Sequence, residues 1–343
     1  MSTSLEQLYR KEDLSLNQAE QFFEEMLSGE LPPERIAAAL IALKMKGEKV
    51  REITGLARTI RLHATKVNVG SLRVADCCGT GGDGLGTFNV STASSIVAAT
   101  CGLPMVKHGN RSVSSTSGSA DMIERLGIPL MASSEQAEKM LAATSYCFLF
   151  APHYHPLMKH VGPVRQALAT STIFNLAGPL ANPAEPKVQL MGVPKAELVE
   201  PIAEVLSALG CERALVVHGK GLDELALHGD TTACLATYGK LEPMTICPAD
   251  AGLDYQPLSS IQLNDDDPYK VFTEVLAGQA SEAKLDMVAF NTGALLWTAE
   301  LASSIRDGYT KAREALDSGA VLEKLEAIRA FASELSSSEA EGA

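Results

Sequence analysis

The most informative part of the chain is a glycine-rich run, Asp76-Cys77-Cys78-Gly79-Thr80-Gly81-Gly82-Asp83-Gly84. An apolar segment at 72–75 precedes it and predicts a strand, and a segment rich in Asn, Ser and Thr at 87–92 predicts a capped helix start. Glycines let the backbone turn tightly and bring its N–H groups close to a ligand. A helix N-terminus adds unpaired N–H donors and partial positive charge. The pattern therefore predicts an anion site, and the usual anion is phosphate.

Two common nucleotide-binding motifs do not fit this loop. Gly79, Gly81 and Gly84 match G-x-G-x-x-G, but that fingerprint needs an acidic residue about 20 residues further on to hold a ribose. The next predicted strand instead runs into Lys107 and then Arg111, which suit more phosphate. No Gly-Lys-Ser/Thr triplet closes the loop, so a P-loop is also excluded.

Composition narrows the class of protein. The 343 residues include 29 Lys and Arg and 42 Asp and Glu, which gives a formal net charge of −13. Such a chain repels nucleic acid and anionic membranes, so a phosphate ligand needs a local site or a metal ion. The 7 cysteines have no C-x-x-C spacing and indicate free thiols in a reducing compartment. Without a signal-peptide pattern or a long apolar run, we expect a cytoplasmic protein with no membrane or nucleic-acid partner.

Residues 1–66 are predicted to be wholly helical. A Ser-x-x-Gln capping box at 15–18 opens one helix, and the Pro-Pro pair at 32–33 starts the next, which Gly47 ends. Apolar residues at 50–60 repeat with helical spacing and predict a third helix. Short amphipathic helices bury little core alone, so we expect them to pack on the rest of the chain or on a partner subunit.

From residue 72 the pattern changes to strand, turn, helix and strand. Strands are predicted at 72–75, 104–106, 147–150 and 214–217, with helices at 91–101, 120–126, 135–143 and 196–209. This alternation predicts an α/β fold with a mainly parallel central sheet flanked by helices. Segments 234–238 and 243–247 predict a hairpin attached to the sheet, and residues 336–343 are expected to fray.

The predicted domains are a small all-helical domain and a larger α/β domain. The helical domain comprises 1–66 and is completed by helices within about 155–185, and the α/β domain comprises 70–150 and 186–343.

Polar residues gather at predicted strand ends, where ligands bind in open α/β sheets. One cluster is Lys107-His108-Gly109-Asn110-Arg111-Ser112-Val113-Ser114-Ser115. The alternative is a solvated loop in which His108 is packed and takes no part in proton transfer. Asp223 and Glu224 follow a glycine turn and could hold Mg²⁺, although an ordinary acidic loop has the same composition.

Two other features are less specific. His153, His155 and His160 lie close in sequence, but their spacing fits no common zinc site and the flanking prolines favour a rigid loop. Arg165 lies on a predicted helix and offers a fork of donors for a carboxylate, with an ordinary surface arginine as the alternative.

Together these motifs resemble those of the anthranilate phosphoribosyltransferase family. They are Gly79-Thr80-Gly81-Gly82-Asp83, Asn89-Val90-Ser91-Thr92, Lys107-His108-Gly109-Asn110-Arg111, Val164-Arg165 and Asp223-Glu224, in the family's order and spacing from about residue 8 to 329. The resemblance implies a helical and an α/β domain with the ligand between them, and a homodimer joined through the helical domain. It also implies transfer of a phosphoribosyl group from phosphoribosyl pyrophosphate (PRPP) to the amine of anthranilate. The products are N-(5-phosphoribosyl)anthranilate and pyrophosphate, in tryptophan biosynthesis.

The resemblance implies a role for each matching residue. The implied PRPP-binding residues are Gly79, Gly82, Asp83, Thr87, Asn89, Val90, Ser91, Thr92, Lys107, His108, Gly109, Asn110, Arg111, Ser112, Val113, Ser114, Ser115 and Ser119. The implied anthranilate contacts are Gly79, Asn110 and Arg165, and the implied Mg²⁺ positions are Ser91, Asp223 and Glu224. No catalytic general base is expected, because the amine of anthranilate is already a nucleophile.

The chain departs from the family pattern at a few positions. Cys77-Cys78 replaces two aliphatic residues, 169–172 lacks the arginine of Gly-x-Arg-Thr, and Ala177 replaces a leucine. One alternative is a pyrimidine nucleoside phosphorylase of the same fold, which carries Lys-His-Ser at 107–110 and uses no Mg²⁺. The other is a noncatalytic nucleic-acid-binding relative, which loses the glycine-rich loop and carries a basic surface. Asn110, the Asp223-Glu224 pair and the net charge of −13 weigh against both.

Overall fold

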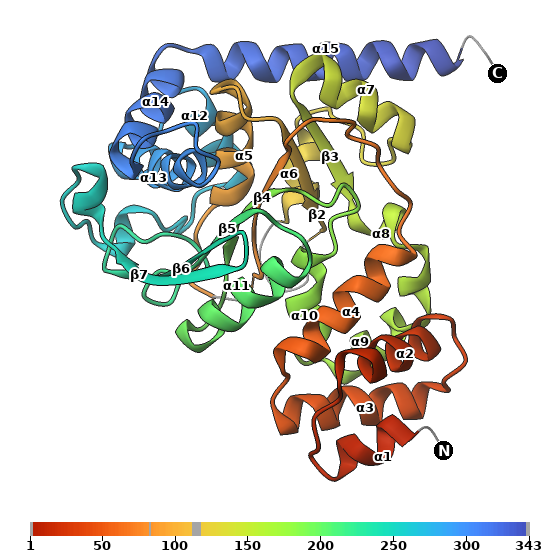
Figure 1. The fold of residues 1–343 in the computed structure, drawn as a ribbon. Coiled ribbons are helices and arrows are strands. Elements are labelled where there is room, and N and C mark those ends of the chain that lie inside the picture. Colours follow the sequence, from red (N-terminus) through yellow and green to blue (C-terminus); the bar gives the residue numbers. More distant parts are fainter. Residues whose placement is uncertain (1–2, 82–83, 112–117, 341–343) are drawn as a thin grey trace.

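The structure is a computed structural model that describes residues 3–81, 84–111 and 118–340, with residue 3 and residues 336–340 described by their backbone alone. The predicted site residues Gly82, Asp83, Ser112, Val113, Ser114 and Ser115 lie outside the described residues. Figure 1 shows a helical part at the N-terminal end and a larger part in which helices surround a sheet. No helix in the described ranges has both the length and the apolar composition needed to cross a membrane.

The N-terminal part is helical, as predicted. Its helices are α1 (Thr3–Tyr9), α2 (Leu16–Leu27), α3 (Pro33–Lys46) and α4 (Val50–Leu62). The capping box at the start of α2 is confirmed, because the Ser15 and Gln18 side chains each accept the other's backbone N–H. Gly47 follows α3 with a φ of +86°, a conformation that favours glycine. The sequence interpretation missed α1, which is only two turns long.

These helices pack against later segments of the same chain. One buried cluster joins apolar side chains of α1 to α4 with those of α9 (Gly162–Leu168), α10 (Ile173–Ala177) and α11 (Val199–Ala208). Arg61 of α4 also donates to the carbonyl oxygens of Leu180 at 2.7 Å and Leu209 at 3.2 Å. Much of the apolar surface of these helices is therefore buried against later segments of the chain, and the domain limits at 66, 155 and 185 stay a prediction.

In the described part of the chain the sheet has seven strands, in the order β3-β2-β1-β4-β5-β6-β7. The strands are β1 (Ala75–Gly79), β2 (Met105–Gly109), β3 (Tyr146–Phe150), β4 (Val188–Gly192), β5 (Arg213–His218), β6 (Thr231–Thr237) and β7 (Lys240–Ile246). Strands β1 to β5 run parallel, and β6 and β7 form the predicted hairpin attached to β5. The predicted α/β class with a mainly parallel sheet is confirmed.

Several predicted limits are wrong. The strand predicted at 72–75 lies at Ala75–Gly79, and the one predicted at 104–106 continues to Gly109. Both strands run on through polar residues, Asp76 and Lys107, which are buried here. Strand β4 was missed, and residues 336–340, which were expected to fray, continue the last helix.

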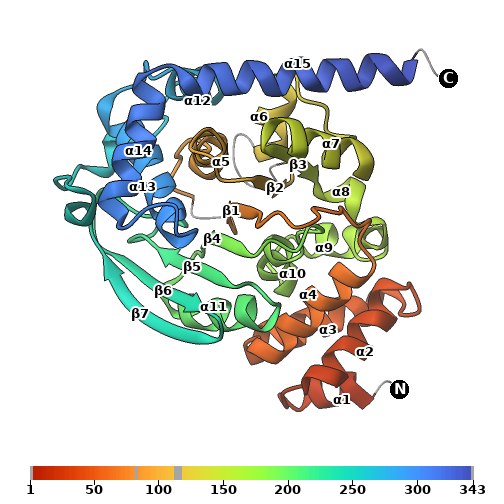
Figure 2. The ribbon, with the colours of Figure 1, turned by 45° about the horizontal axis from the view of Figure 1, so that its top comes forward.

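Helices cover both faces of the sheet (Figure 2). A second buried cluster lies on the face covered by α5 and α13, and α4, α10 and α11 cover the opposite face. The remaining helices are α5 (Val90–Thr100), α6 (Ser119–Arg125), α7 (Ser134–Thr144), α8 (Ala151–Tyr154), α12 (Pro268–Leu276), α13 (Glu282–Thr298), α14 (Ile305–Asp317) and α15 (Ala320–Ala340). The helix after β1 and the helix after β4 lie on opposite faces, so the strand order reverses between these neighbours. Ligands of open α/β sheets bind at the carboxyl ends of the strands at such a point.

Candidate functional site

The glycine-rich loop after β1 is held against the end of β4 and against the segment that follows β5. Thr80 N–H donates to the Gly192 carbonyl at 3.0 Å, and Gly81 N–H donates to Asp223 Oδ2 at 2.6 Å. A Cβ atom at Gly79 would lie 2.2 Å from Asp223 Oδ2, and one at Gly192 would lie 1.5 Å from the Asp223 carbonyl oxygen. Glycine is therefore required at the ends of both β1 and β4 so that Asp223 can approach them.

The neighbouring carboxylate meets the start of α5. Glu224 Oε1 accepts the backbone N–H of Ser91, the second residue of the helix, at 3.1 Å. The expected capping by Asn, Ser and Thr side chains is wrong here, since Asn89 occupies the N-cap position without a side-chain capping bond. A carboxylate from a distant segment satisfies this helix start instead, and it is favoured there by the helix dipole.

Lys107 brings a positive charge to the same place. Its side chain is buried, with 2% of the residue exposed, and its Nζ contacts the Cys77 carbonyl oxygen and lies 3.3 Å from Ser91 Oγ. Thus Lys107, Ser91 and Glu224 form a continuous chain of polar contacts, with Asp223 next to Glu224. The structure therefore brings together the predicted metal positions and the central lysine of the predicted PRPP site.

Arg111 has other partners. Its guanidinium donates to Asp121 and Glu124, each at 2.8 Å, and it lies exposed at the surface. Asn110 is exposed beside it, and the Asn110 carbonyl accepts from Ser119 Oγ at 3.3 Å. The end of β2 and the start of α6 are thereby joined, and Gly109 fits because a Cβ there would lie 2.2 Å from Ser119 Oγ.

The remaining predicted PRPP residues lie around the start of α5. Thr87 forms a bridge with Gln262 just before the helix. Val90 and Thr92, in the first turn, have buried side chains, and the Val90 N–H donates to the Phe88 carbonyl oxygen at 2.7 Å.

The His108 ring packs against His155. Their Nε2 atoms lie 3.1 Å apart, and the rings meet edge to face with centroids 5.1 Å apart. Burial lowers the pKa of His108 well below its usual range and that of His155 to about 4, so both rings are neutral at pH 7. Within the described ranges no group of three or more His, Cys, Asp and Glu side chains could hold a metal ion.

Arg165 lies on α9, as predicted. Its guanidinium carbon lies 5.2 Å from the centre of the Phe174 ring. Burial lowers its pKa, and the guanidinium has no ion pair or hydrogen bond with any residue that the structure describes. A half-buried guanidinium with open donors above an aromatic ring can bind a planar carboxylate.

Three positioning residues were missed from the sequence. Asn291 of α13 accepts Leu225 N–H at 2.9 Å and donates to the Leu225 carbonyl at 3.2 Å, which fixes the backbone directly after Glu224. Asp76 and Asn182 are fully buried between β1 and β2. The available signal was a single polar residue within an apolar run, which also occurs in ordinary cores.

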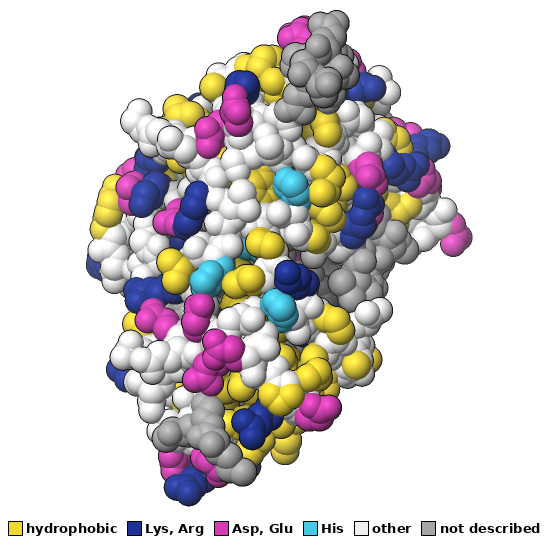
Figure 3. Space-filling model, turned by 90° about the vertical axis from the view of Figure 1, so that its right-hand side faces the viewer, with side chains coloured by type: hydrophobic (Ala, Val, Ile, Leu, Met, Phe, Trp, Pro, Cys, Tyr) yellow, Lys and Arg dark blue, Asp and Glu magenta, His cyan; other side chains and the backbone are white. Residues whose placement is uncertain are grey.

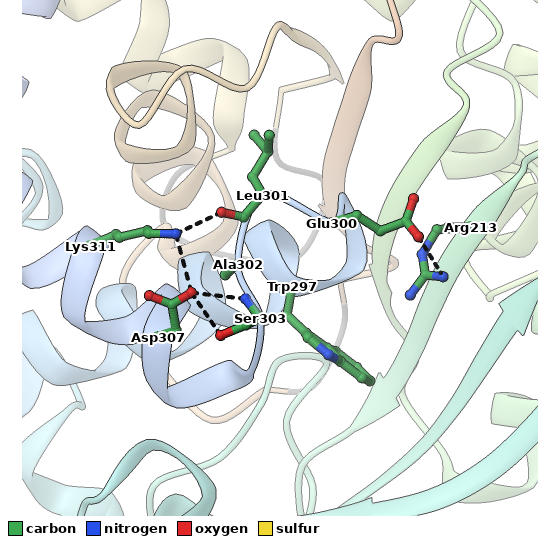
Figure 4. A pocket seen from close by; sticks show the side chains of 8 residues that line it. All are labelled: Arg213, Trp297, Glu300, Leu301, Ala302, Ser303, Asp307 and Lys311. Carbon is green, nitrogen blue, oxygen red and sulfur yellow. Dashed lines mark hydrogen bonds and ion pairs between the residues drawn. The ribbon is translucent and has the colours of Figure 1, made fainter.

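A separate hollow lies at the amino ends of the strands, away from the candidate site (Figure 4). It is lined by Arg213, Trp297, Glu300, Leu301, Ala302, Ser303, Asp307 and Lys311. Its charges pair with one another, Arg213 with Glu300 at 3.3 Å and Lys311 with Asp307 at 3.2 Å. Because Arg213 begins β5, this hollow is remote from the carboxyl ends of the strands and is no part of the candidate site.

Family models match both parts of the chain. The helical bundle domain of a glycosyl transferase family matches residues 2–64, and the a/b domain of that family matches residues 71–322. An anthranilate phosphoribosyltransferase of Tolumonas auensis is 47% identical over 326 residues, which cover 95% of this chain and 97% of that protein. The chain belongs to the anthranilate phosphoribosyltransferase family.

Solved structures of the anthranilate phosphoribosyltransferase family share the fold. The enzyme of Thermus thermophilus matches with a TM-score of 0.89 and 37% identity, covering 96% of this chain and 98% of that one. The enzyme of Saccharomyces cerevisiae in complex with PRPP and Mg matches with a TM-score of 0.82 and 29% identity, covering 93% of each chain.

Acidic and basic side chains are mixed on the face shown in Figure 3, without the extended basic stripe that nucleic-acid-binding proteins carry.

Proposed function

We propose that this chain transfers the 5-phosphoribosyl group of PRPP to the amine of anthranilate and releases pyrophosphate, a step toward tryptophan. Membership of the anthranilate phosphoribosyltransferase family supports this reaction. The structural observation that carries it is the contact chain Lys107–Ser91–Glu224 at the carboxyl end of the sheet. A cation, a helix N-terminus and paired carboxylates meet there, as binding of a polyanionic phosphate ester with a metal ion requires.

The protein acts mainly on the leaving group. As the bond between ribose C1 and the pyrophosphate oxygen breaks, negative charge grows on pyrophosphate and positive charge on the ribose. The Lys107 ammonium is held by its contacts with the Cys77 carbonyl oxygen and Ser91 Oγ before reaction, so it stabilises this charge without reorganising, and the dipole of α5 adds partial positive charge. The glycine-rich loop at Gly79, with the end of β2, would form the walls around PRPP.

Arg165 would hold the acceptor. Its open guanidinium binds the anthranilate carboxylate, while Asn110 and the backbone of Gly79 contact the remainder. The amine lone pair then forms the bond to C1, and the extra proton on nitrogen leaves to water. Orientation supplies much of the rate, because it replaces an encounter between two free molecules.

Asp223 and Glu224 fit a Mg²⁺ ion. Their carboxylates are the oxygen ligands that this ion prefers, they are 7% and 9% exposed, and Ser91 Oγ is close by. A bound Mg²⁺ supplies positive charge to the pyrophosphate group. Asp223 and Glu224 at the same time orient the glycine-rich loop and α5 through their bonds to Gly81 and Ser91.

We further propose a homodimer formed through the helical domain. Large apolar side chains are exposed there, including Tyr9, Met45 and Leu62, whose exposed fractions are 51%, 72% and 71%.

All seven cysteines are free, which supports a reducing compartment such as the cytoplasm.

The deciding experiment follows anthranilate fluorescence on mixing with PRPP and Mg²⁺. We expect the fluorescence to fall with time, and only when protein, PRPP and Mg²⁺ are all present. A stable signal, together with phosphorolysis of a pyrimidine nucleoside in a parallel assay, would replace this proposal with the phosphorylase alternative.

A further inference from the structure

The sheet is split between β1 and β2. Among the residues that the structure describes, these neighbours pair in register at Ala75 and Met105 alone, at the amino end of both strands. Along its other edge β1 pairs with β4 through to Gly79, and β2 pairs with β3 through to Gly109. The backbones of β1 and β2 therefore separate toward their carboxyl ends, where the candidate site lies.

Two buried side chains occupy the split. Asp76 Oδ1 accepts the backbone N–H of His108 at 3.3 Å and that of Cys77 at 2.8 Å. Asn182 Nδ2 donates to Asp76 Oδ2 and to the Val106 carbonyl, both at 2.9 Å. Backbone groups of β2 that would pair with β1 in a continuous ladder are thus satisfied by side chains, as buried backbone groups must be.

Lys107 lies between Val106 and His108, whose backbone groups are held by Asn182 and Asp76. Because the backbone is fixed on both sides of Lys107, the direction of its side chain is fixed as well. Its ammonium crosses the split to the Cys77 carbonyl oxygen and Ser91 Oγ. In a closed ladder the Cys77 carbonyl oxygen would pair with the backbone of β2 and would be unavailable to the lysine.

We propose that Asp76 and Asn182 are positioning residues that hold β2 away from β1 and thereby aim the Lys107 ammonium at the pyrophosphate group of PRPP. This inference rests on the proposed function for the identity of the anion. Asp76 and Asn182 touch no substrate, since both are fully buried. Burial disfavours the charged form of the Asp76 carboxylate and thereby raises its pKa. A buried carboxylate also costs folding free energy. An apolar pair would avoid that cost but could not satisfy the separated backbone groups.

The test compares two isosteric changes of buried carboxylates. Asp76→Asn keeps the acceptor for His108 but turns an N–H group toward Asn182 Nδ2, which breaks the bond between the side chains. Glu52→Gln is the control, because Glu52 is also fully buried and accepts backbone N–H groups, from Leu14 at 3.0 Å and Lys49 at 2.9 Å, in addition to its ion pair with Lys46 at 2.9 Å. It lies in α4, in the helical part.

The measurements are the thermal midpoint, the KM for each substrate, and the Kd of PRPP and of inorganic pyrophosphate by calorimetry. We expect both variants to unfold at lower temperature than the wild type. Only Asp76→Asn should raise the KM and Kd of PRPP, by about tenfold to a hundredfold, because losing a charge-assisted contact between the Lys107 ammonium and pyrophosphate has an effect of that order. The KM of anthranilate should change far less, because Arg165 lies on another element.

The inference is overturned if a folded Asp76→Asn protein binds PRPP as tightly as the wild type does. It is also overturned if Glu52→Gln loses as much PRPP affinity as Asp76→Asn does. Should Asp76→Asn fail to fold, Asn182→Ala tests the same split from the other side chain, by releasing the Val106 carbonyl, with the same expected and overturning results. Absence of turnover by the wild type would count against the proposed function alone. The pyrophosphate Kd of the same variants would still decide whether Asp76 aims Lys107.

Discussion

Glu224 accepts the backbone N–H of Ser91 at 3.1 Å, although the two residues are 133 positions apart in the sequence. The bond ties the loop after β5 to the start of α5, and Asp223 makes the equivalent link to Gly81 at 2.6 Å. The two carboxylates therefore have a structural role in addition to the proposed metal-binding role. Changes at these positions should affect the geometry of the loop as well as the charge of the site.

We expect Asp223→Asn with Glu224→Gln to nearly abolish turnover. Loss of one close charge-stabilising contact costs about 2.7–4 kcal/mol of barrier, and the Mg²⁺ concentration for half-maximal rate should rise. The measurement is the initial rate against Mg²⁺ concentration, with circular dichroism to verify folding. The exposed pair Asp265→Asn with Asp266→Asn removes the same charge elsewhere and should leave the curve unchanged. A wild-type Mg²⁺ curve in the 223/224 variant would remove these residues from the metal site.

Arg165→Ala should mainly raise the KM for anthranilate. Losing a charge-assisted hydrogen bond costs about 1.5–3 kcal/mol, or roughly tenfold to a hundredfold. Arg165→Lys keeps the charge but loses the planar fork, so we expect an intermediate effect. Steady-state kinetics with each substrate varied in turn provides the check. An equal rise in the KM for PRPP would mean that Arg165 does not act on the acceptor.

Local signals in the sequence predicted several helix limits and the main motifs. The capping box at Ser15 and the helix end at Gly47 depend on neighbouring residues, and both were found where predicted. The glycine-rich loop, Lys107 and the Asp223-Glu224 pair could be placed at strand ends for the same reason. Their contacts with one another required the fold, because they join segments that are far apart in the sequence.

The limits of β1 and the existence of β4 could not be predicted in this way. Asp76 looks like the end of a strand, since a carboxylate is rarely buried, but Asn182, 106 positions away, supplies its partner. Strand β4 is equally short and contains Gln189, whose Nε2 donates to the Pro179 carbonyl at 3.1 Å. Long-range polar partners of this kind make a polar residue compatible with a central strand.

Cys77→Val with Cys78→Val should retain activity. Burial raises the pKa of both thiols, so neither is a thiolate at pH 7, and their side chains belong to the buried clusters on opposite faces of the sheet. The extra volume should cost about 1 kcal/mol or somewhat more. Cys78→Val should be the costlier single change, because Cys78 Sγ accepts from Gln189 Nε2 at 3.3 Å. Chemical denaturation and turnover of each single variant are the measurements, and a thousandfold loss of turnover in a folded protein would assign a thiol to the reaction.

The His108–His155 pair should make stability depend on pH. Burial lowers the pKa of both rings in the folded protein, that of His155 to about 4, whereas in the unfolded chain histidine titrates near a pKa of about 6.5. The unfolded state therefore binds more protons below about pH 6.5. The stability that the neutral pair contributes to the folded protein is therefore fully present above pH 6.5 and is lost as the pH falls toward 4.

His155→Asn removes one of the two titrating rings. The thermal midpoint of this variant should therefore fall less between pH 6.5 and pH 4 than that of the wild type. The comparison is of slopes, because the variant also loses the contact with His108 Nε2 and should be less stable at pH 8. Identical slopes in the two proteins would show that His155 is already protonated in the folded state or that its burial is relieved before unfolding.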